Sequence, residues 1–374
     1  MSTPIQMESA PGPETVIDGV RYLYFGGTSY LGLAAHPEVI EAGCEALRRY
    51  GVHSATTRAR FGTIPPVLEV ERKAAEFFGV AGAFYFSSGY MANHILVSAL
   101  ADGVDAVLVE EGAHFCVLEA ARLAQVPGFF FRAAEPDSLR RIVAGARRPM
   151  ILADAVGPAS GILAPVTTYL EILGEAESGT LLLDDAHGFG VLGANGRGLL
   201  EELGYWSRVN GQSPADRVQI CVGGTLAKAM GGFGGIIPGT PEFVSRVRGA
   251  SHYYDGASAP ASAVAGSTAR ALELVLRNPG IRLQLRENIL RLKRGLRLLG
   301  FAVPDGGAAQ LGVAVGNAEN MKRIHDALKK RGVWLPYFPA YSGISADGVL
   351  RFAVFATHSS DQIDCLLAEL KSLL

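Results

Sequence analysis

The sequence predicts an α/β protein with a large domain built on a mostly parallel, doubly wound sheet and a smaller α+β domain after it. Short apolar segments alternate with helical segments along much of the chain, which is the rhythm of strand–helix–strand units. Past Pro260 the pattern changes to a long helix, followed by short strands mixed with helices. A chain of 374 residues that is 49% hydrophobic can bury the large core that two domains need.

The first 35 residues predict an N-terminal arm, in which residues 20–25 alternate like a short strand until Gly26 and Gly27 end it. A helix is expected at 36–49, because Pro37 suits the first helical position and Gly51 follows the end. A second helix is expected at 66–78, before Gly79. We therefore expect an arm (1–35), a large domain (36–258) and a small C-terminal domain (259–374).

Short apolar runs predict the strands of the sheet at 83–86, 106–109, 128–131, 150–153, 181–184 and 219–222. A helix at 90–100 follows Ser87, Ser88 and Gly89. Residues 195–217, with their Gly, Asn, Ser and Pro residues, predict a linker that makes a long surface excursion between two core strands. In the C-terminal part we expect strands at 313–315 and 350–354 and helices at 318–331 and 360–373.

Charge and composition argue against several classes of function. The net charge is −2 with acids and bases well mixed, so no basic surface for nucleic acid is implied. The arginines of 282–297 fit the solvated face of an amphipathic helix, whose apolar side is formed by Leu283, Leu285, Ile289, Leu290, Leu292 and Leu296.

The four cysteines lack metal-site or disulfide spacing and fit reduced thiols in a cytoplasmic protein. Neither a signal peptide nor an apolar run of membrane-spanning length is visible.

Lys228 and Asp184 carry the strongest chemical signal. Lys228 lies among small residues between Gly223 and Gly235, where an amine can approach a flat carbonyl cofactor and form an imine with it. Asp184 ends an apolar strand, at the edge of the sheet where α/β proteins bind ligands. A carboxylate there can hold the protonated nitrogen of a pyridine ring, and His187 could bond the ring's phenolic oxygen. Together the two residues predict a pyridoxal 5'-phosphate (PLP) site.

Other interpretations of this segment stay open. Either aspartate could cap a helix, and His187 could be a satisfied core histidine. Residues 188–193 spell G-x-G-x-x-G, a dinucleotide fingerprint, but irregular chain continues after them where that fingerprint needs a helix. Asp184, Asp185 and His187 could bind a metal, although no further His or Cys follows at ligand spacing.

Further residues could complete a site for a phosphorylated cofactor. Ser88, Gly89 and Tyr90 stand where a strand passes into a helix, which exposes backbone N–H groups suited to a phosphate, although Ser and Gly also cap ordinary helices. Thr225 could donate a hydroxyl to the same phosphate. His114 follows a strand and could stack on the ring, or it could be a surface-loop histidine.

Arg351 lies in an otherwise apolar strand, so its guanidinium needs a partner. A substrate carboxylate is a good bidentate partner, and an internal salt bridge is the alternative.

With these residues in place, the chain resembles the α-oxoamine synthase family of fold-type-I PLP-dependent enzymes over nearly its whole length. The most specific stretches are 184–198 and Gly224-Thr225-Leu226-Ala227-Lys228-Ala229. The resemblance implies that Lys228 forms the imine with PLP, Asp184 holds the pyridine nitrogen, His187 the phenolic oxygen, and His114 stacks on the ring. By the same resemblance, Gly89, Tyr90 and Thr225 bind the phosphate, and Arg351 binds the substrate carboxylate.

The family condenses a small amino acid with an acyl thioester, loses carbon dioxide and releases an α-amino ketone, as a homodimer with active sites at the subunit interface. We expect this activity here. The alternative is another fold-type-I PLP enzyme, such as an aminotransferase or lyase. A third hypothesis is a non-catalytic paralogue, and the presence of Lys228 argues against it.

Several departures from the family pattern bear on the substrate or the interface rather than on the cofactor. The family usually has Asn at the position of Thr28 and His just before 68–69. It also has a glycine-rich stretch at 53–57, of which only Thr57 and the residue after it still fit. Different residues also stand at 158–161 and at 255–257. Thr28 and Thr57 are expected to face the substrate, whose identity therefore stays open.

Overall fold

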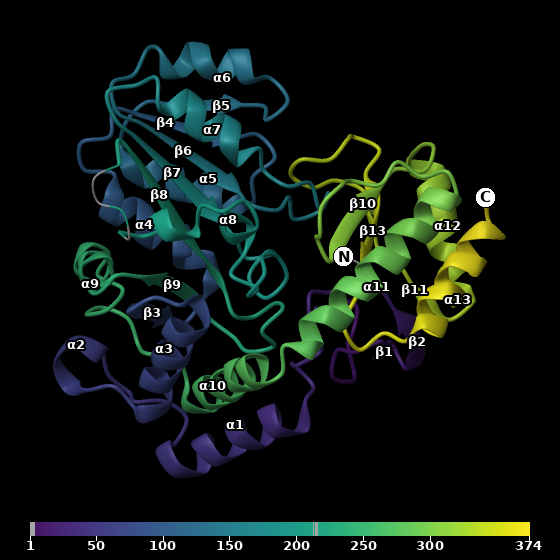
Figure 1. Ribbon diagram of the computed structural model, residues 1–374. Coiled ribbons are helices and arrows are strands. Elements are labelled where there is room, and N and C mark those ends of the chain that lie inside the picture. Colours follow the sequence, from purple (N-terminus) through teal and green to yellow (C-terminus); the bar gives the residue numbers. More distant parts are fainter. Residues whose placement is uncertain (1–3, 212, 214–215) are drawn as a thin grey trace.

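The computed structural model describes residues 4–211, 213 and 216–374 (Figure 1). The first three residues of the predicted arm, and residues 212, 214 and 215 of the predicted linker, lie outside this part. A larger unit holds the main sheet, and a smaller C-terminal unit lies beside it (Figure 1). None of the helices described is long and apolar enough to cross a membrane.

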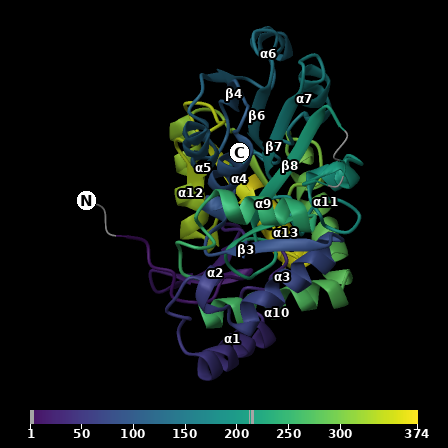
Figure 2. The same ribbon diagram turned by 90° about the vertical axis from the view of Figure 1, so that its left-hand side faces the viewer.

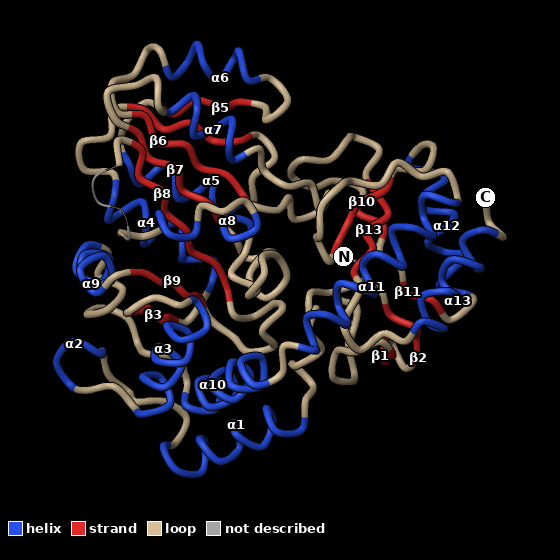
Figure 3. The backbone as a smooth tube through the Cα atoms, in the orientation of Figure 1, coloured by secondary structure: helices blue, strands red, loops and turns tan. Residues whose placement is uncertain are grey.

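The large unit is built on a sheet with the strand order β3-β9-β8-β7-β6-β4-β5 (Figure 3). All its strands run in one direction except β9, which is antiparallel to both neighbours. The mostly parallel sheet is thus confirmed. Its strands are β3 (Gly82–Phe86), β4 (Ala106–Glu110), β5 (Gly128–Phe131), β6 (Pro149–Asp154), β7 (Gly179–Asp184), β8 (Val218–Thr225) and β9 (Gly235–Gly239).

The strand β9 was not predicted. Glycine stands at both of its ends and Pro238 lies within it, so the segment has the composition of a loop. Its pairing with β3 supplies the regularity that its own residues do not indicate.

Helices cover both faces of this sheet. One face packs against α4, α5 and α9, with Val107, Met150 and Leu182 in the contact layer; Figure 2 looks onto α4 and α9. The opposite face, with Leu108, Ile151 and Leu183, belongs to the main core. The helices of the unit are α1 (Pro37–Tyr50), α2 (Arg58–Phe61), α3 (Pro65–Phe78), α4 (Ala92–Leu100), α5 (Phe115–Ala121), α6 (Pro136–Val143), α7 (Val166–Leu173), α8 (Leu199–Glu202) and α9 (Pro241–Ala250), with short 3-10 turns η1 (Gly89–Met91), η2 (Arg122–Ala124) and η3 (Trp206–Arg208).

The smaller unit combines two three-stranded sheets, β1-β2-β11 and β10-β13-β12, with helices. Its strands are β1 (Glu14–Ile17), β2 (Val20–Tyr24), β10 (Gln310–Val313), β11 (Val333–Trp334), β12 (Tyr337–Phe338) and β13 (Val349–Ala353). Its helices are α11 (Gly280–Leu298), α12 (Ala318–Lys330) and α13 (Ser360–Lys371). The N-terminal arm therefore pairs with the C-terminal unit, since β2 runs parallel to β11.

The single long helix expected after Pro260 is wrong: two helices, α10 (Ser262–Arg277) and α11, occupy this stretch. Pro279 has no N–H to donate and disfavours helical backbone at Asn278, whose ψ is 79°. The apolar side expected in α11 is also only partly buried, because Leu283 and Leu290 are exposed. Its arginines are not simply solvated, since Arg286 donates to the carbonyl of Gly193.

The predicted linker at 195–217 does join β7 to β8, but it is not a plain surface excursion. Leu199, Leu200 and Trp206 are buried in the core. The indole N–H of Trp206 donates to the carbonyl of Phe78 at 2.9 Å. The polar composition of this segment concealed the few large side chains that anchor it.

Candidate active site

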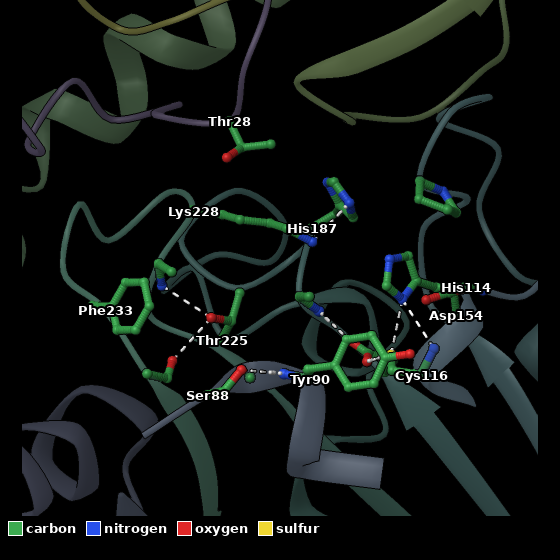
Figure 4. A pocket seen from close by; sticks show the side chains of 16 residues that line it. Thr28, Ser88, Tyr90, His114, Cys116, Asp154, His187, Thr225, Lys228 and Phe233 are labelled. Carbon is green, nitrogen blue, oxygen red and sulfur yellow. Dashed lines mark hydrogen bonds between the residues drawn. The ribbon is translucent and has the colours of Figure 1, made fainter. Parts of the chain in front are cut away.

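A cavity of about 290 Å³ lies at the carboxyl edge of the sheet, where β6, β7 and β8 contribute Asp154, Asp184 and Thr225. Figure 4 shows side chains from several segments around it. Most of the predicted site residues line it, namely Thr28, Ser88, Gly89, Tyr90, His114, Asp184, His187, Thr225 and Lys228. Arg351 and Thr57 do not belong to the lining.

Asp184 is buried at the end of β7 and is held by several donors. Its Oδ2 accepts from Nδ2 of Asn93 at 2.7 Å and from Sγ of Cys116 at 3.5 Å. Its Oδ1 accepts from the backbone N–H of Ala186 at 3.0 Å. These hydrogen bonds fix the orientation of the Asp184 carboxyl group at the cavity, where it can accept from a positively charged N–H group.

Asp154 ends the neighbouring strand β6, directly opposite Asp184 in the register of the parallel pair. Its Oδ2 accepts from the backbone N–H of His114 at 2.6 Å. Burial, and then the charge of Asp184, raise the pKa of Asp154 well above its ordinary value. Two adjacent buried carboxyl groups resist double ionisation, and protonation of the pair is favoured at Asp154.

Lys228 ends a chain of hydrogen bonds that begins at Arg351. The guanidinium of Arg351 lies 3.4 Å from the hydroxyl of Tyr30. That hydroxyl lies 2.8 Å from Nδ1 of His187, and Nε2 of the same ring lies 2.9 Å from Nζ of Lys228. Figure 4 shows Lys228 and His187 meeting in the cavity below Thr28.

Arginine only donates, so the Tyr30 oxygen accepts from Arg351. The Tyr30 hydroxyl can donate its hydrogen to Nδ1 of His187, and in that tautomer Nε2–H of His187 faces Nζ of Lys228. Burial lowers the pKa of Lys228, although Asp184 opposes this shift, and burial holds the pKa of His187 well below its ordinary value. The cavity thus presents an amine whose pKa is held below the ordinary value of lysine.

His114 caps the N-terminus of α5, with Nδ1 accepting from the backbone N–H of Cys116. Burial lowers its pKa below the ordinary value. The ring lines the cavity as a neutral, flat group, which suits stacking on another ring.

The turn of Ser88, Gly89 and Tyr90 lies against Thr225 at the opposite end of the cavity from Thr28 (Figure 4). A Cβ on Gly89 would stand 2.4 Å from Cβ of Thr225, so only glycine allows this approach. The predicted helix at 90–100 is replaced by η1 at this turn, followed by α4. The turn brings small side chains and backbone N–H groups to one corner of the cavity.

Arg351 is buried behind the cavity wall. Besides Tyr30, it donates to the carbonyls of Pro158 and Gly27, both at 3.2 Å. No ion pair involves Arg351 in the described chain, so the internal salt bridge considered as its alternative role is not found there. A guanidinium has five N–H donors, and these three bonds leave others free.

The dinucleotide and metal interpretations of 184–193 do not fit the geometry. No helix opens on the glycines, since the chain forms turns until α8 begins at Leu199. Asp185 is buried and accepts from the backbone N–H of Leu199 at 2.7 Å, which makes it a brace for this segment. Across the described residues, no group of three or more His, Cys, Asp or Glu side chains is arranged to hold a metal ion.

Comparison with known proteins agrees with this geometry. Residues 22–370 match the family described as aminotransferase class I and II. The chain belongs to this family. Among curated relatives, the 8-amino-7-oxononanoate synthase of Herminiimonas arsenicoxydans is 33% identical, over 98% of this chain and 93% of its own length. That of Pseudomonas paraeruginosa (strain DSM 24068 / PA7) is 34% identical, over 97% of this chain and 88% of its own length.

A solved structure of a family member extends the likeness to three dimensions. Serine palmitoyltransferase from S. paucimobilis, determined with a bound PLP adduct, superposes with a TM-score of 0.88. It is 26% identical, and the match covers 99% of this chain and 92% of that one. The predicted resemblance to α-oxoamine synthases and the predicted fold-type-I architecture are both confirmed.

The family's cofactor chemistry matches the residues of this cavity. An amine, a carboxyl group and a flat imidazole surround it, and the Gly89–Thr225 contact leaves a corner that a side chain on residue 89 would fill. This donor set fits a phosphorylated pyridine aldehyde.

Sequence reasoning missed three residues of the site: Tyr30, Asn93 and Asp154. Asp154 repeats the signal used for Asp184, an apolar strand that ends in an acid. Asn93 is a polar residue in an apolar helical stretch, which also could have marked it. No local pattern indicates the role of Tyr30, whose contacts come from residues 157 and 321 positions away.

Two of the residues that depart from the family pattern, Thr28 and Pro158, line the cavity and so face whatever binds there. Thr57, which fits the pattern, bridges Ser258 outside the lining, and its expected contact with substrate stays a prediction.

Proposed function

We propose that the protein is a PLP-dependent α-oxoamine synthase that condenses a small amino acid with an acyl thioester, on CoA or a carrier protein. The carrying observation is that one cavity unites the buried amine of Lys228, the carboxyl group of Asp184 and the Gly89–Thr225 corner. The names of the relatives favour this activity over another reaction of the same fold.

The residues of the cavity divide the work of holding the cofactor. Nζ of Lys228 would bind its aldehyde carbon, Asp184 its pyridine nitrogen and Nε2–H of His187 its phenolic oxygen. Ser88, Gly89, Tyr90 and Thr225 would hold the phosphate, and His114 would lie on the ring. When bound, PLP supplies an electron-withdrawing ring that makes a carbanion at the amino acid's Cα accessible.

The chain's own groups then direct the reaction. The displaced Lys228 amine takes and returns the proton at Cα, and Arg351 orients the substrate carboxylate. A bond forms between Cα and the acyl carbon, while the C–S bond breaks and releases the thiol. The bond from Cα to the carboxyl group also breaks, so carbon dioxide leaves and an α-amino ketone remains.

Two measurements test this proposal. Purified protein with added PLP should show the visible band of the lysine-bound cofactor; a protein that stays colourless would be a non-catalytic paralogue. Thiol should be released from an acyl thioester only when a small amino acid is present. Keto-acid release without any thioester would identify an aminotransferase instead.

The assembly and the domain division belong to the same proposal. We infer a cytoplasmic homodimer with active sites at the subunit interface, in which Thr57 and residues 255–257 would lie near the partner's site. The division into 1–35, 36–258 and 259–374 is kept, although the packing of α10 on α1 and α3 favours placing its second boundary at the break beside Pro279.

A further inference from the structure

A second cavity, of about 380 Å³, adjoins the first at the carboxyl ends of β4 and β6. Asp154 lines both cavities and forms their common wall. Two consecutive residues also line different cavities: Pro158 lines the first cavity and Gly157 lines the second. A molecule that reacts above Lys228 therefore has a second chamber directly beside it.

The lining of this second chamber is mainly small and apolar, with Ala133, Ala134, Leu163, Ala164 and Pro165. A Cβ on Gly157 would lie 2.3 Å from Oγ of Ser160, so the wall is closely packed at this position. Such walls offer an aliphatic chain dispersion contacts and removal from water.

The ionisable groups that line the chamber are both carboxyl groups, those of Glu110 and Asp154, and no Lys, Arg or His is among its lining residues. The hydroxyl of Tyr169 donates to Glu110 at 3.4 Å, and burial raises the pKa of this carboxyl. A ligand carboxylate in this chamber would lose its hydration without gaining a cation as a partner, which is costly.

We propose that this chamber binds the acyl chain of the thioester substrate and selects an uncharged, aliphatic chain over one that ends in a carboxylate. The inference rests on the proposed condensation and adds its substrate class. The proposed preference differs from what the relatives' name, 8-amino-7-oxononanoate synthase, implies for them. Their product is a nonanoate, so the chain that it contains ends in a carboxylate.

The test compares two thioesters of equal carbon number, octanoyl-CoA and suberoyl-CoA, which differ only in the end of the chain. The PLP-loaded enzyme receives the amino acid that shifts its visible band most, and released thiol is measured. We expect kcat/KM for octanoyl-CoA to exceed that for suberoyl-CoA about tenfold or more, because burial of a carboxylate without a cation partner is costly. Glu110→Gln should narrow this ratio by raising kcat/KM for suberoyl-CoA, because the amide of glutamine offers N–H donors to the ligand carboxylate. Equal rates, or a preference for suberoyl-CoA, would overturn the inference.

A size-change variant tests the place of the chain. Ala164→Phe should lower kcat/KM for octanoyl-CoA at least about tenfold relative to acetyl-CoA, because it fills the chamber. Ala164→Leu provides a milder change should the larger ring prevent folding, which the visible band would report. Ala194→Phe, at a cavity elsewhere on the molecule, is the matched control and should leave the ratio unchanged. An unchanged ratio in both Ala164 variants contradicts the inference, whereas release from no thioester contradicts the proposed function itself.

Discussion

Asp154 and Asp184 face each other at the ends of two adjacent parallel strands, yet their side chains have different partners. Asp184 receives hydrogen bonds from Asn93, Ala186 and Cys116, whereas the recorded donor to Asp154 is the backbone N–H of His114. The two carboxyl groups are therefore unequal: protonation is favoured at Asp154, and the residue assigned to the cofactor is Asp184. The two residues should respond very differently to the same substitution.

Asp184→Asn should lower kcat/KM about 100-fold or more, because it removes a preorganised charge from the site. Asp154→Asn replaces a protonated carboxyl with a neutral amide of similar shape and should cost about tenfold at most. Both variants are assayed for amino-acid-dependent thiol release, after PLP loading is checked by absorbance. An equal loss in the two variants would mean that the charge is shared.

Asp185 predicts a measurable dependence of stability on pH. Burial raises its pKa from 3.8 to about 7. In that window the folded state keeps a proton that the unfolded chain releases, so this group's contribution to the free energy of unfolding falls as pH rises. The whole shift in pKa, from 3.8 to about 7, corresponds to roughly 4 kcal/mol of the free energy of unfolding.

Asp185→Asn should remove this contribution. Urea unfolding of the apoprotein from pH 4 to pH 8 gives the free energy of both proteins, and the difference between them is the measured quantity. The variant should gain stability relative to the native protein as pH rises. A difference that stays constant with pH would show that Asp185 titrates normally.

The sheet could be predicted from the sequence because its central strands are buried on both faces. Such strands appear as short apolar runs bounded by glycine or acids, as in 181–184. β9 was not predicted because it lacks such an apolar run. Its glycines and Pro238 acquire strand geometry only by pairing with neighbouring strands. The linker at 195–217 shows the same limit, because the buried side chains of Leu199, Leu200 and Trp206 anchor a segment of loop composition.

The site shows a similar division. Asp184, His187 and Lys228 lie in distinctive local patterns and meet as expected around one cavity. Tyr30 could not be predicted, because its function depends on contacts with His187 and Arg351 that only the packing of the small unit against the large one creates. Residues that act through another residue leave little local signal.

Gly89→Ala should weaken PLP binding at least about tenfold, because the added Cβ would collide with Thr225 and overpacking costs about 1–3 kcal/mol. Titration of apoprotein with PLP, followed by visible absorbance, gives the affinity. Gly249→Ala is a matched control, since a Cβ at this position in α9 would meet nothing within 4 Å. Unchanged affinity in Gly89→Ala would remove this turn from the phosphate site.

Arg351 has two separable tasks, and a pair of variants distinguishes them. If its free N–H groups bind the substrate carboxylate, Arg351→Lys should raise KM for the amino acid about tenfold or more, because lysine cannot reproduce a bidentate contact. Tyr30→Phe keeps Arg351 but cuts the chain to His187, so it should lower kcat and shift the pH profile of the lysine-bound cofactor band with little change in KM. Steady-state kinetics and a pH titration of that band measure both effects. If Arg351→Lys instead reproduces the Tyr30→Phe result, the arginine serves only to orient Tyr30 and His187, and the carboxylate must bind elsewhere.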